Sequence, residues 1–505
     1  MTLWLLGTHL DRTADYLEDH DRVLLIESTE FARRRPYHPH KLTLVFAAMR
    51  RFRDDLRARG ITVDYRQADT FPMGLDTHFD AYPGDDLAMP RPAAHGAEAR
   101  LRSLVEDRGG SLTFLPNPTF ILTPDAFDGW AESRTTKDPE TYRLEGFYRH
   151  VRRETGVLMD GDDPVGGEWN YDDQNRETPP DGWEPPEPPL FEPGKTTREV
   201  SSWVADEFET FVDDDETAPF RWPVTRSQSL DALEAFVDAR FAEFGQYQDA
   251  MVEGEWAMSH SLLSASINVG LLRPMEVIER AERAFEDGDA PINSVEGFVR
   301  QVLGWREFMR HVYRRSMPEM AEANQLGQTE ALPPAYWTGE TEMTCLSEAI
   351  DHVREHGYAH HIERLMVLSN FALLYGADPG ELNEWFHQGF VDAFHWVTTP
   401  NVVGMGSFAT DALSSKPYAS SGSYVNRMSD YCASCPYAVS RDTGEGACPF
   451  NSLYWTFLRE HEERLRGTGR MGLMYSHVDD KDETEWEALE ARAERVREMA
   501  RQGTL

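Results

Sequence analysis

Four cysteines constrain the fold of this chain more than any other feature of its sequence. Three of them, Cys432, Cys435 and Cys448, lie in one short stretch, and the fourth, Cys345, lies 87 residues upstream of the first. A Cys-x-x-Cys pair can direct two thiolates onto one metal centre, and two further thiolates complete either a tetrahedral zinc site or a [4Fe–4S] cluster. We therefore expect these distant segments to meet in space.

Two other interpretations of the cysteines are disulfide bonds and unrelated thiols. Disulfides are disfavoured because the chain is too long to need them and begins without a secretory signal. Unrelated thiols are disfavoured because the Cys-x-x-Cys pair holds half of a scarce residue type. A proline follows both Cys435 and Cys448, which keeps each cysteine out of a helix interior. The spacing alone does not distinguish zinc from an iron–sulfur cluster.

The length of 505 residues predicts two or more domains, because single cores stop growing near about 250–300 residues. A hydrophobic content of 40% is enough to fill such cores. No apolar run reaches the roughly 18 residues that would cross a bilayer. The first residues lack a basic region and reach Asp11 at once, which is not typical of a signal peptide. We expect a cytoplasmic protein with no membrane partner.

The chain is strongly acidic, with 88 Asp and Glu against 50 Lys and Arg and a formal charge of −38. Such a charge would ordinarily repel a nucleic acid. However, few of the basic residues are lysines, and the acidic residues are spread along every segment, a pattern typical of halophilic archaea. In molar salt the Debye length falls to about 3 Å, so net charge no longer governs association. The charge therefore does not exclude DNA as a partner.

Strand-like and helix-like patterns alternate in the first 125 residues. Residues 3–7 and 23–27 are short apolar runs, as in buried parallel strands, and apolar residues recur at helical spacing between Pro39 and Gly60. Residues 61–66 and 111–115 predict further strands, with a helix at 98–108 between them. This alternation predicts a doubly wound α/β domain over residues 1–125.

The rest of the chain divides into a linker, a helical domain and a charged tail. Residues 160–195 are rich in Pro, Gly and Asp, and we predict an interdomain linker over 126–199. From residue 200 to 478 the pattern is helical almost throughout, most clearly at 295–309, 346–356, 361–375 and 379–388. Residues 479–505 predict a charged, solvated helix. The predicted architecture is an α/β domain, a linker and an all-α domain that carries the cysteines.

Polar residues in the helical domain suggest a binding site. The hydroxyl-rich segment 259–272 could present donors to a phosphate, although serines at helix starts are common. His360 and Arg364 are four residues apart on one helix face, and adjacent histidines can also be ordinary polar residues at a helix start. Asp392 lies in an apolar run and needs a cation, for which Arg364 is the natural candidate.

These segments together resemble one family, the iron–sulfur bacterial cryptochromes and photolyases, also described as the prokaryotic (6-4) photolyases or deoxyribodipyrimidine photolyase-related proteins. The similarity extends over nearly the whole chain. It is carried by Ala48-Met-Arg, Phe244-Gly-x-Tyr-Gln-Asp-Ala-Met, Gly304-Trp-Arg-Glu-Phe, the histidine pair, Pro400-Asn-Val-x-Gly-Met and Lys416-Pro-Tyr through Tyr431-Cys-x-x-Cys-x-Tyr. The resemblance implies a photolyase fold and light-driven repair of (6-4) photoproducts in DNA with a flipped-out lesion.

The resemblance also implies cofactors. The helical domain would bind FAD and, through Cys345, Cys432, Cys435 and Cys448, a [4Fe–4S] cluster. The residues at flavin positions of the family are Tyr247, Ser261, Leu263, Ser264, Arg306, Arg364, Asp392, Thr398 and Asn401. Among them Ser261 and Ser264 would face the pyrophosphate, and Arg364 with Asp392 would form the ion pair beside the flavin ring. Thr398 stands near flavin N5, where relatives often carry Asn or an acid.

The same resemblance implies roles in catalysis and light harvesting. One of His360 and His361 would protonate or hydrogen-bond the lesion, and Trp385 and Trp337 would relay electrons. Phe386 stands where a tyrosine is common, so photoreduction could be slower or rerouted. A lumazine antenna, 6,7-dimethyl-8-ribityllumazine, would lie in the α/β domain, although the segment from Glu27 to Tyr37 matches the family poorly.

Two alternative functions stay open at the sequence level. The first is a cryptochrome-type blue-light photoreceptor, which would share the cofactors, although the two histidines favour repair. The second is a nucleic-acid-binding helical protein stabilised by zinc or a cluster, without photochemistry. We expect the protein to act as a monomer on UV-damaged DNA.

Overall fold

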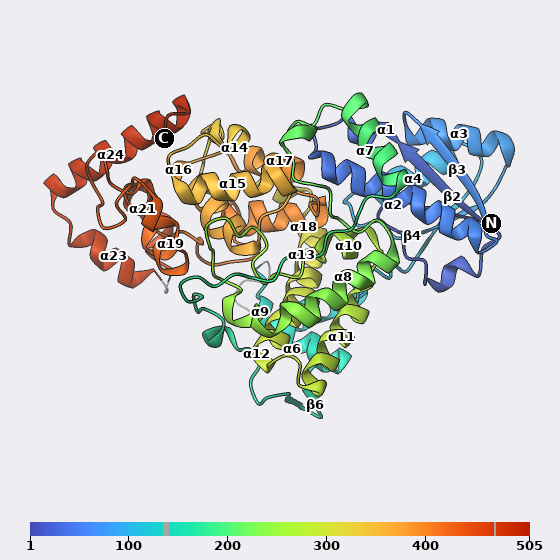
Figure 1. Ribbon diagram of the computed structural model, residues 1–505, viewed down its shortest axis with the longest axis horizontal. Helices are drawn as coiled ribbons and strands as arrows, with labels where there is room; N and C mark the ends of the chain where they lie inside the picture. Colours follow the sequence, from blue (N-terminus) through green and yellow to red (C-terminus); the bar gives the residue numbers. More distant parts are fainter. Residues whose placement is uncertain (135–140, 469–470) are drawn as a thin grey trace.

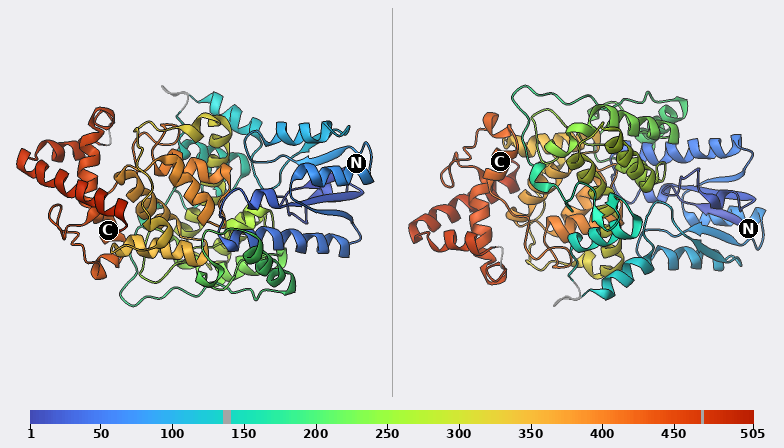
Figure 2. Two further views of the ribbon diagram at one scale, coloured as in Figure 1. Left: turned by 90° about the horizontal axis from the view of Figure 1, so that it is seen from above. Right: turned by 90° about the horizontal axis from the view of Figure 1, so that it is seen from below.

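The computed structural model of the protein describes residues 1–134, 141–468 and 471–505. A five-stranded parallel sheet with its helices forms one end of an elongated molecule, and helices form the rest (Figure 1). Both views of Figure 2 place the C-terminal helices at the opposite end from the sheet. The predicted fold class, an α/β domain followed by an all-α region, is confirmed. Residues 135–140 of the predicted linker and 469–470 of the predicted helical domain lie outside the described residues.

The sheet is doubly wound because its strands are apolar on both faces. The strand order is β3-β2-β1-β4-β5, with bounds β1 (Thr2–Leu5), β2 (Arg22–Ser28), β3 (Thr62–Ala68), β4 (Leu87–Pro90) and β5 (Leu112–Leu115). Leu3 and Leu25 pack with helix α2 (Pro39–Ala58) on one face. Trp4 and Leu24 pack with α3 (Phe71–Ala81) and α4 (Ala97–Glu106) on the other. The sequence patterns had not revealed α3 and β4.

The interval 126–199 is more ordered than a linker. It contains most of α5 (Pro124–Ser133), the whole of α6 (Leu144–Thr155), the short strands β6 (Met159–Asp160) and β7 (Asp163–Pro164), and the start of α7 (Lys195–Glu207). Phe127, Phe147 and Tyr148 from these helices are buried in the main helical core. The Pro- and Gly-rich stretch between β7 and α7 is irregular, apart from one short helical turn, as its composition predicts. Helix α7 then packs on α2.

The helical region is built from many short helices around one large core. Its α-helices are α8 (Arg226–Ala239), α9 (Phe241–Tyr247), α10 (Ser264–Val269), α11 (Pro274–Asp287), α12 (Ile292–Val299), α13 (Glu307–Ser316), α14 (Ala335–Thr338), α15 (Thr344–His356), α16 (Asn370–Tyr375), α17 (Pro379–Gly389), α18 (His395–Thr399), α19 (Gly422–Met428), α20 (Tyr431–Ser434), α21 (Pro449–Glu460), α22 (Glu462–Leu465), α23 (Gly472–Asp479) and α24 (Glu483–Gln502). Three π-helical segments, η4 (Arg300–Arg306), η6 (Glu363–Ser369) and η7 (Pro400–Gly406), adjoin α12, α16 and α18. Such segments are rare and often occur at functional sites.

The last helix differs from the prediction of a solvated tail. One face of α24 carries Trp486, Leu489, Ala493 and Val496, which are buried against the core, and α24 packs on α21. The charged residues of α24 occupy its other face, so the helix is amphipathic rather than free in solvent. No helix in the described parts of the chain is long and apolar enough to span a membrane.

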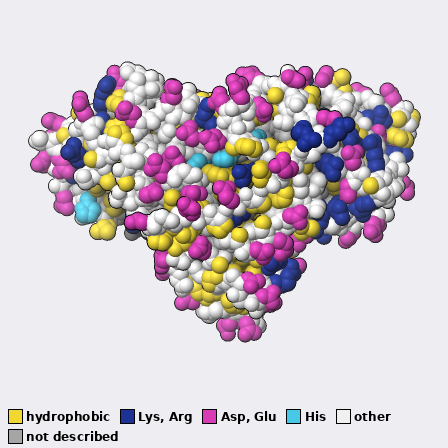
Figure 3. Space-filling view, viewed as in Figure 1, with side chains coloured by type: hydrophobic (Ala, Val, Ile, Leu, Met, Phe, Trp, Pro, Cys, Tyr) yellow, Lys and Arg dark blue, Asp and Glu magenta, His cyan; other side chains and the backbone are white. Residues whose placement is uncertain are grey.

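The acidic excess lies on the helical part of the molecule. Residues 1–125 carry 16 Lys and Arg against 19 Asp and Glu, whereas residues 126–505 carry 34 against 69. In Figure 3 the Lys and Arg side chains gather on the α/β domain, while Asp and Glu are spread over the whole visible face. A polyanion approaching the helical part therefore meets most of the repulsive charge.

Candidate functional site

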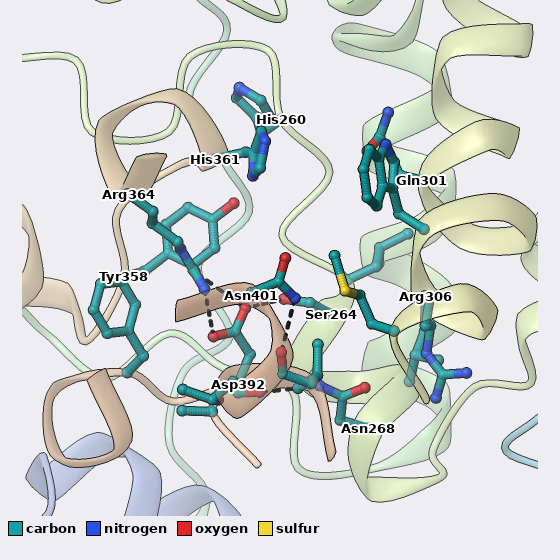
Figure 4. A pocket seen from close by; sticks show the side chains of 18 of the residues that line it. His260, Ser264, Asn268, Gln301, Arg306, Tyr358, His361, Arg364, Asp392 and Asn401 are labelled. Atoms are coloured by element: carbon teal, nitrogen blue, oxygen red, sulfur yellow. Dashed lines mark hydrogen bonds and ion pairs between the residues drawn. The ribbon is translucent and has the colours of Figure 1, made fainter. Parts of the chain in front are cut away.

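The helical region encloses a cavity of about 290 Å³. Residues from all three π-helical segments line it, including Arg306 of η4, Arg364 of η6 and Asn401 of η7 (Figure 4). A π-helical turn adds a residue to the helix and so redirects the side chains next to it. The three irregular turns thus bring polar groups from distant parts of the sequence to one cavity.

An ion pair forms one wall of the cavity. Arg364 donates to Asp392 through two bonds, Nη1 to Oδ1 at 3.0 Å and Nη2 to Oδ2 at 3.1 Å. The Ser264 hydroxyl donates to Asp392 Oδ2 at 2.7 Å. Burial alone would raise the pKa of Asp392, but the Arg364 charge and these hydrogen bonds bring it below its ordinary value. Asp392 is therefore a buried carboxylate that stays ionised. The Ser264 hydroxyl already donates its hydrogen bond to this carboxylate.

Arg306 lies on another wall and is incompletely paired. Its guanidinium packs over the rings of Phe120 and Trp396, at 4.8 and 4.9 Å from their centroids. Nη1 donates to Glu307 at 3.2 Å, whereas Nε and Nη2 are buried without a hydrogen-bond partner in the described structure. Burial lowers the pKa of Arg306 to about 10, so it remains a cation. Such buried donors require an acceptor, which a bound ligand could supply.

Three histidines surround one end of the cavity. His260 and His361 line it and lie together at the top of the view in Figure 4. His360 is fully buried behind them, where its ring stacks on His260 with centroids 4.8 Å apart and an angle of 13°. Burial, followed by the charges of Arg364 and His360, lowers the pKa of His361 to about 4. His360 and His361 were predicted from the sequence as site residues, whereas His260 was not.

Glu363 holds His360 from the side away from the cavity. Its Oε1 accepts from His352 Nδ1 and from the Tyr431 hydroxyl, both at 2.9 Å, and its Oε2 accepts from the backbone N–H of His360 at 3.3 Å. His360 Nε2 lies 3.6 Å from the same oxygen. Burial alone would raise the pKa of Glu363, but His360 and His352 bring it to about 2. Glu363 is therefore a carboxylate anion at neutral pH, and it lies on the side of His360 away from the cavity.

Aromatic rings extend from the cavity wall to Trp385 and Tyr336, and Trp337, the residue after Tyr336, reaches the surface. Phe386 and Phe390 line the cavity and pack against the ring of Trp385, with centroids at 5.2 and 5.8 Å. Trp385 is fully buried, lies edge-on to Tyr336 at 5.1 Å and donates its Nε1–H to the Tyr336 carbonyl at 2.8 Å. Trp337 follows directly and is 39% exposed. The two tryptophans from the sequence analysis thus lie behind the cavity wall and at the surface.

The other residues expected to contact a cofactor differ in position. Ser261, Leu263, Thr398 and Asn401 line the cavity, whereas Tyr247 lies apart from it and packs on Trp183. The motif that contains Tyr247 begins in helix α9. The Tyr247 side chain faces Trp183 of the irregular segment rather than the cavity. Lining residues that the sequence analysis did not select include Phe244, Asn268, Gln301, Trp305, Tyr358 and Trp396. In the sequence, η4 was marked by Arg and Trp within an apolar helix, and η7 by the motif Pro400-Asn-Val-x-Gly-Met.

The four cysteines meet around a small second cavity. Cys345 lies in the first turn of α15, Cys432 in α20, and Cys435 and Cys448 border α20 and α21. None is in a disulfide. Burial, followed by the charges of the other three thiols, raises the pKa of Cys345 well above its usual value. In the described part of the chain, no three His, Cys, Asp or Glu side chains form a group that could hold a metal ion.

The environment of the cysteines is nonetheless built for a large group. A Cβ on Gly422 would lie 2.7 Å from the Cys448 sulfur, so only glycine leaves room there. A single zinc ion would require four sulfurs about 3.8 Å apart, given its Zn–S distance of about 2.3 Å. The four thiols line a common space.

The segment from Glu27 to Tyr37, expected to hold an antenna, is internally paired. Glu27 accepts two bonds from Arg50, at 2.6 and 2.9 Å, one from Gln67 at 2.9 Å and one from the Tyr65 hydroxyl. Tyr37 is buried and stacks on Phe31. These groups are satisfied by other protein residues, and the lumazine antenna stays a prediction.

Comparison with known proteins gives consistent matches. The model of the family described as deoxyribodipyrimidine photo-lyase-related protein matches residues 3–217. A (6-4) photolyase of Agrobacterium fabrum is 40% identical over 464 residues, which are 90% of either chain. A bacterial class III photolyase from Agrobacterium tumefaciens shares the fold, with a TM-score of 0.58 at 16% identity, over 99% of this chain and 96% of that one. An archaeal photolyase from Sulfolobus tokodaii, solved with two FAD molecules, covers 98% and 100% with a TM-score of 0.53 at 13% identity.

Proposed function

The chain belongs to the family of deoxyribodipyrimidine photolyase-related proteins, and we propose that it repairs pyrimidine (6-4) photoproducts in UV-damaged DNA by light-driven electron transfer from reduced FAD. One observation carries the proposal. A cavity walled by the Arg364–Asp392 ion pair also carries histidines at one end and an aromatic path at its back. Electron transfer to a flipped-out base needs both a dry flavin site and hydrogen-bonding groups for the base.

The residues of the cavity fit a bound flavin. Arg306 offers two buried donors without partners, and Arg364 with Asp392 provides a fixed charge pair beside apolar side chains. Asn401 donates its own amide to the Val397 carbonyl, which orients its oxygen. When bound and reduced, FAD supplies the electron on excitation by blue light. The protein residues hold the ring, exclude water and keep the surrounding charges fixed.

The other residues of the site have separate tasks. Trp385 and Trp337 would carry an electron inward from the surface along the aromatic path, so that the flavin can be reduced again. His361, which lines the cavity, would hydrogen-bond the lesion. Its low pKa keeps the ring neutral at pH 7, so it offers one donor and one acceptor. In this proposal residues 200–478 form the flavin- and cluster-binding domain.

We assign a [4Fe–4S] cluster to the four cysteines. Four sulfur donors with no fifth cysteine fit such a cluster, and Gly422 leaves room for it. The thiols must lose their protons on binding, so the raised pKa values of Cys345, Cys432 and Cys448 make cluster assembly dependent on pH. Protein purified without oxygen should contain iron and sulfide, and each Cys→Ser variant should lose both. Zinc with neither iron nor sulfide would contradict the assignment.

Illumination of two matched oligonucleotides tests the proposed function. One carries a (6-4) photoproduct and the other a cyclobutane dimer, and the assay is run in molar salt to screen the acidic surface. We expect light-dependent restoration of the (6-4) substrate by the wild-type protein. Repair of the dimer alone would change the assigned lesion. Bound flavin with no repair of either substrate would favour a photoreceptor.

A further inference from the structure

His260 is a half-buried residue with no role in the assignments above. It lines the cavity next to His361, and its Nε2 is buried without a hydrogen-bond partner in the described structure. Its backbone carbonyl accepts a bond from Arg240 at 2.6 Å, and its ring lies edge-on to Phe244 at 5.6 Å. The Phe244 and His360 rings thus hold the side chain, while its Nε2 has no partner in the described structure.

The loop that carries His260 is strained. Met258 and Leu262, two residues before and after it, both have positive φ angles, of 45° and 58°. Residues other than glycine rarely adopt this conformation, because the Cβ atom then crowds the backbone. Strain of this kind persists where the surrounding structure enforces it, and it is concentrated at active sites. The two residues flank His260, whose side chain lines the cavity.

The ring of His260 is supported from behind by His360. The two rings are nearly parallel, and His360 is in turn held by Glu363, which also binds His352 and Tyr431. The charged or titratable groups facing these rings are Glu363 and Arg364 of η6, His352 of α15, His361, and Arg240 at the end of α8. Glu363 is the carboxylate among them, and it lies on the side of His360 away from the cavity.

We propose that His260 is the second histidine that contacts the flipped-out lesion, together with His361, and that His360 is a positioning residue that holds the His260 ring. This inference rests on the proposed function, because it names the residues that would meet the substrate of the same site. It divides the adjacent pair His360–His361 into one residue at the cavity and one behind it. The group that joins His361 is His260, which lies 101 residues earlier in the chain.

The chemistry of the two rings suits a pyrimidine lesion. Burial, followed by the charges of His360 and His361, keeps the pKa of His260 well below its ordinary value, so the ring is neutral. A neutral imidazole presents one donor and one acceptor. Two such rings side by side can meet the alternating carbonyl and N–H groups on the edge of a flipped pyrimidine. Neither ring adds a charge to the cavity.

Binding to lesion DNA in the dark tests the proposal without photochemistry. His260→Phe keeps a flat ring against His360 and removes only the nitrogens. His360→Phe also keeps the stack, whereas His360→Ala removes it. The matched control is His311→Phe, because His311 is also buried, stacks on Phe127 at 4.7 Å and 11°, and has unpartnered ring nitrogens outside the cavity.

We expect His260→Phe to retain FAD and to lose about 10- to 100-fold in preference for lesion over undamaged DNA, the loss typical of a buried hydrogen bond. His360→Phe should keep most of that preference and His360→Ala should lose it, while His311→Phe stays at the wild-type value. Light-driven repair should fall in parallel.

Three results would overturn the inference. The first is wild-type lesion preference in His260→Phe, and the second is equal loss in His360→Phe and His360→Ala. The third is loss of FAD from His260→Phe, which would make His260 a flavin contact. A wild-type protein that binds the lesion selectively but never repairs it would instead contradict the proposed function and leave the role of His260 in binding intact.

Discussion

Two buried carboxylates, Glu27 in the α/β domain and Asp392 in the helical region, are paired in nearly the same way. Each accepts two hydrogen bonds from one arginine, and each receives a further bond from a hydroxyl group. Their surroundings differ. The groups around Glu27 satisfy each other, whereas the cavity beside Asp392 also contains Arg306 and His260, with buried polar atoms that have no described partner.

This difference separates a structural ion pair from a binding site. A buried charge by itself requires only a partner, and Arg50 is as good a partner for Glu27 as Arg364 is for Asp392. Unpaired donors next to the pair indicate that a further molecule belongs there, because an unsatisfied buried group costs about 1–3 kcal/mol. Matched substitutions at the two ion pairs can test whether the Glu27 pair is structural and the Asp392 pair belongs to a binding site.

The largest effect is expected from breaking the cavity pair. Arg364→Met leaves the Asp392 carboxylate buried without its cation, which should cost about 3–5 kcal/mol of unfolding free energy and should release FAD. Urea unfolding and the flavin absorbance of the purified protein measure the two effects. A variant that retains stoichiometric flavin would show that this pair is as purely structural as the one at Glu27.

The corresponding change in the α/β domain should affect stability only. Glu27→Gln removes the charge that Arg50 pairs with but keeps an acceptor for Gln67 and Tyr65, so we expect a loss of about 1–3 kcal/mol. Flavin content and repair should match the wild type at a temperature where the variant is folded. Loss of a chromophore from this variant would mean that the sheet edge is a binding site after all.

Acid should act on the buried histidines and on the buried carboxylates in different pH ranges. Burial lowers the pKa of His40 to about 4 and the pKa values of His9 and His311 to about 3, so the unfolded chain binds more protons below about pH 6.5. Stability should therefore fall by up to about 1.4 kcal/mol per histidine for each pH unit between about 6.5 and 4. The pKa of Glu27 is also lowered, so its contribution is lost only below about pH 4.5.

Urea titrations at intervals of pH measure this dependence. His40→Gln removes one of the titrating groups and should flatten the upper part of the curve, whereas Glu27→Gln should alter only the part below about pH 4.5. A wild-type stability that is constant from pH 6.5 to 5 would contradict the neutral state assigned to the buried histidines.

The sequence predicted the elements that have regular patterns and missed those that depend on geometry. The apolar runs of β1 and β2 and the periodicity of α2 were sufficient for the fold class. Because a buried Asp392 requires a cation, Arg364 was predicted as its partner. The structure contains this ion pair. The π-helical turns left no trace in the periodicity, because one extra residue per turn shifts a short pattern too little to be noticed.

Residue type alone also could not decide which histidine faces the cavity. His360 and His361 are adjacent, so they must point in different directions from their helix, and only packing decides which one reaches the cavity. His260 could not be predicted as a cavity residue because it lies in a loop with positive φ angles at Met258 and Leu262. A loop of this kind has no periodic pattern from which the position of a side chain can be predicted. Tyr247 was placed at the cavity because its motif matched, although its ring packs elsewhere.

The smallest effect on stability is expected at the end of the aromatic path. Trp337 is 39% exposed, so Trp337→Phe should change the unfolding free energy by only about 0.5 kcal/mol. The reduction of bound flavin under blue light with an external donor should nevertheless slow clearly, because the path would lose its residue at the surface. Trp385→Phe should slow reduction too, but at a larger stability cost, since Trp385 is fully buried and donates to Tyr336.

Repair started with chemically reduced flavin should be unaffected by Trp337→Phe, because the path serves only the recharging of the flavin. Unchanged photoreduction in Trp337→Phe together with slow photoreduction in Trp385→Phe would mean that electrons enter by another route. Tyr336 would then be the next candidate, because its ring lies edge-on to Trp385 at 5.1 Å and its hydroxyl donates to the Leu368 carbonyl, which keeps the ring fixed. A fixed ring in contact with Trp385 can accept an electron hole without moving, so Tyr336→Phe would separate a relay through Tyr336 from one that bypasses it.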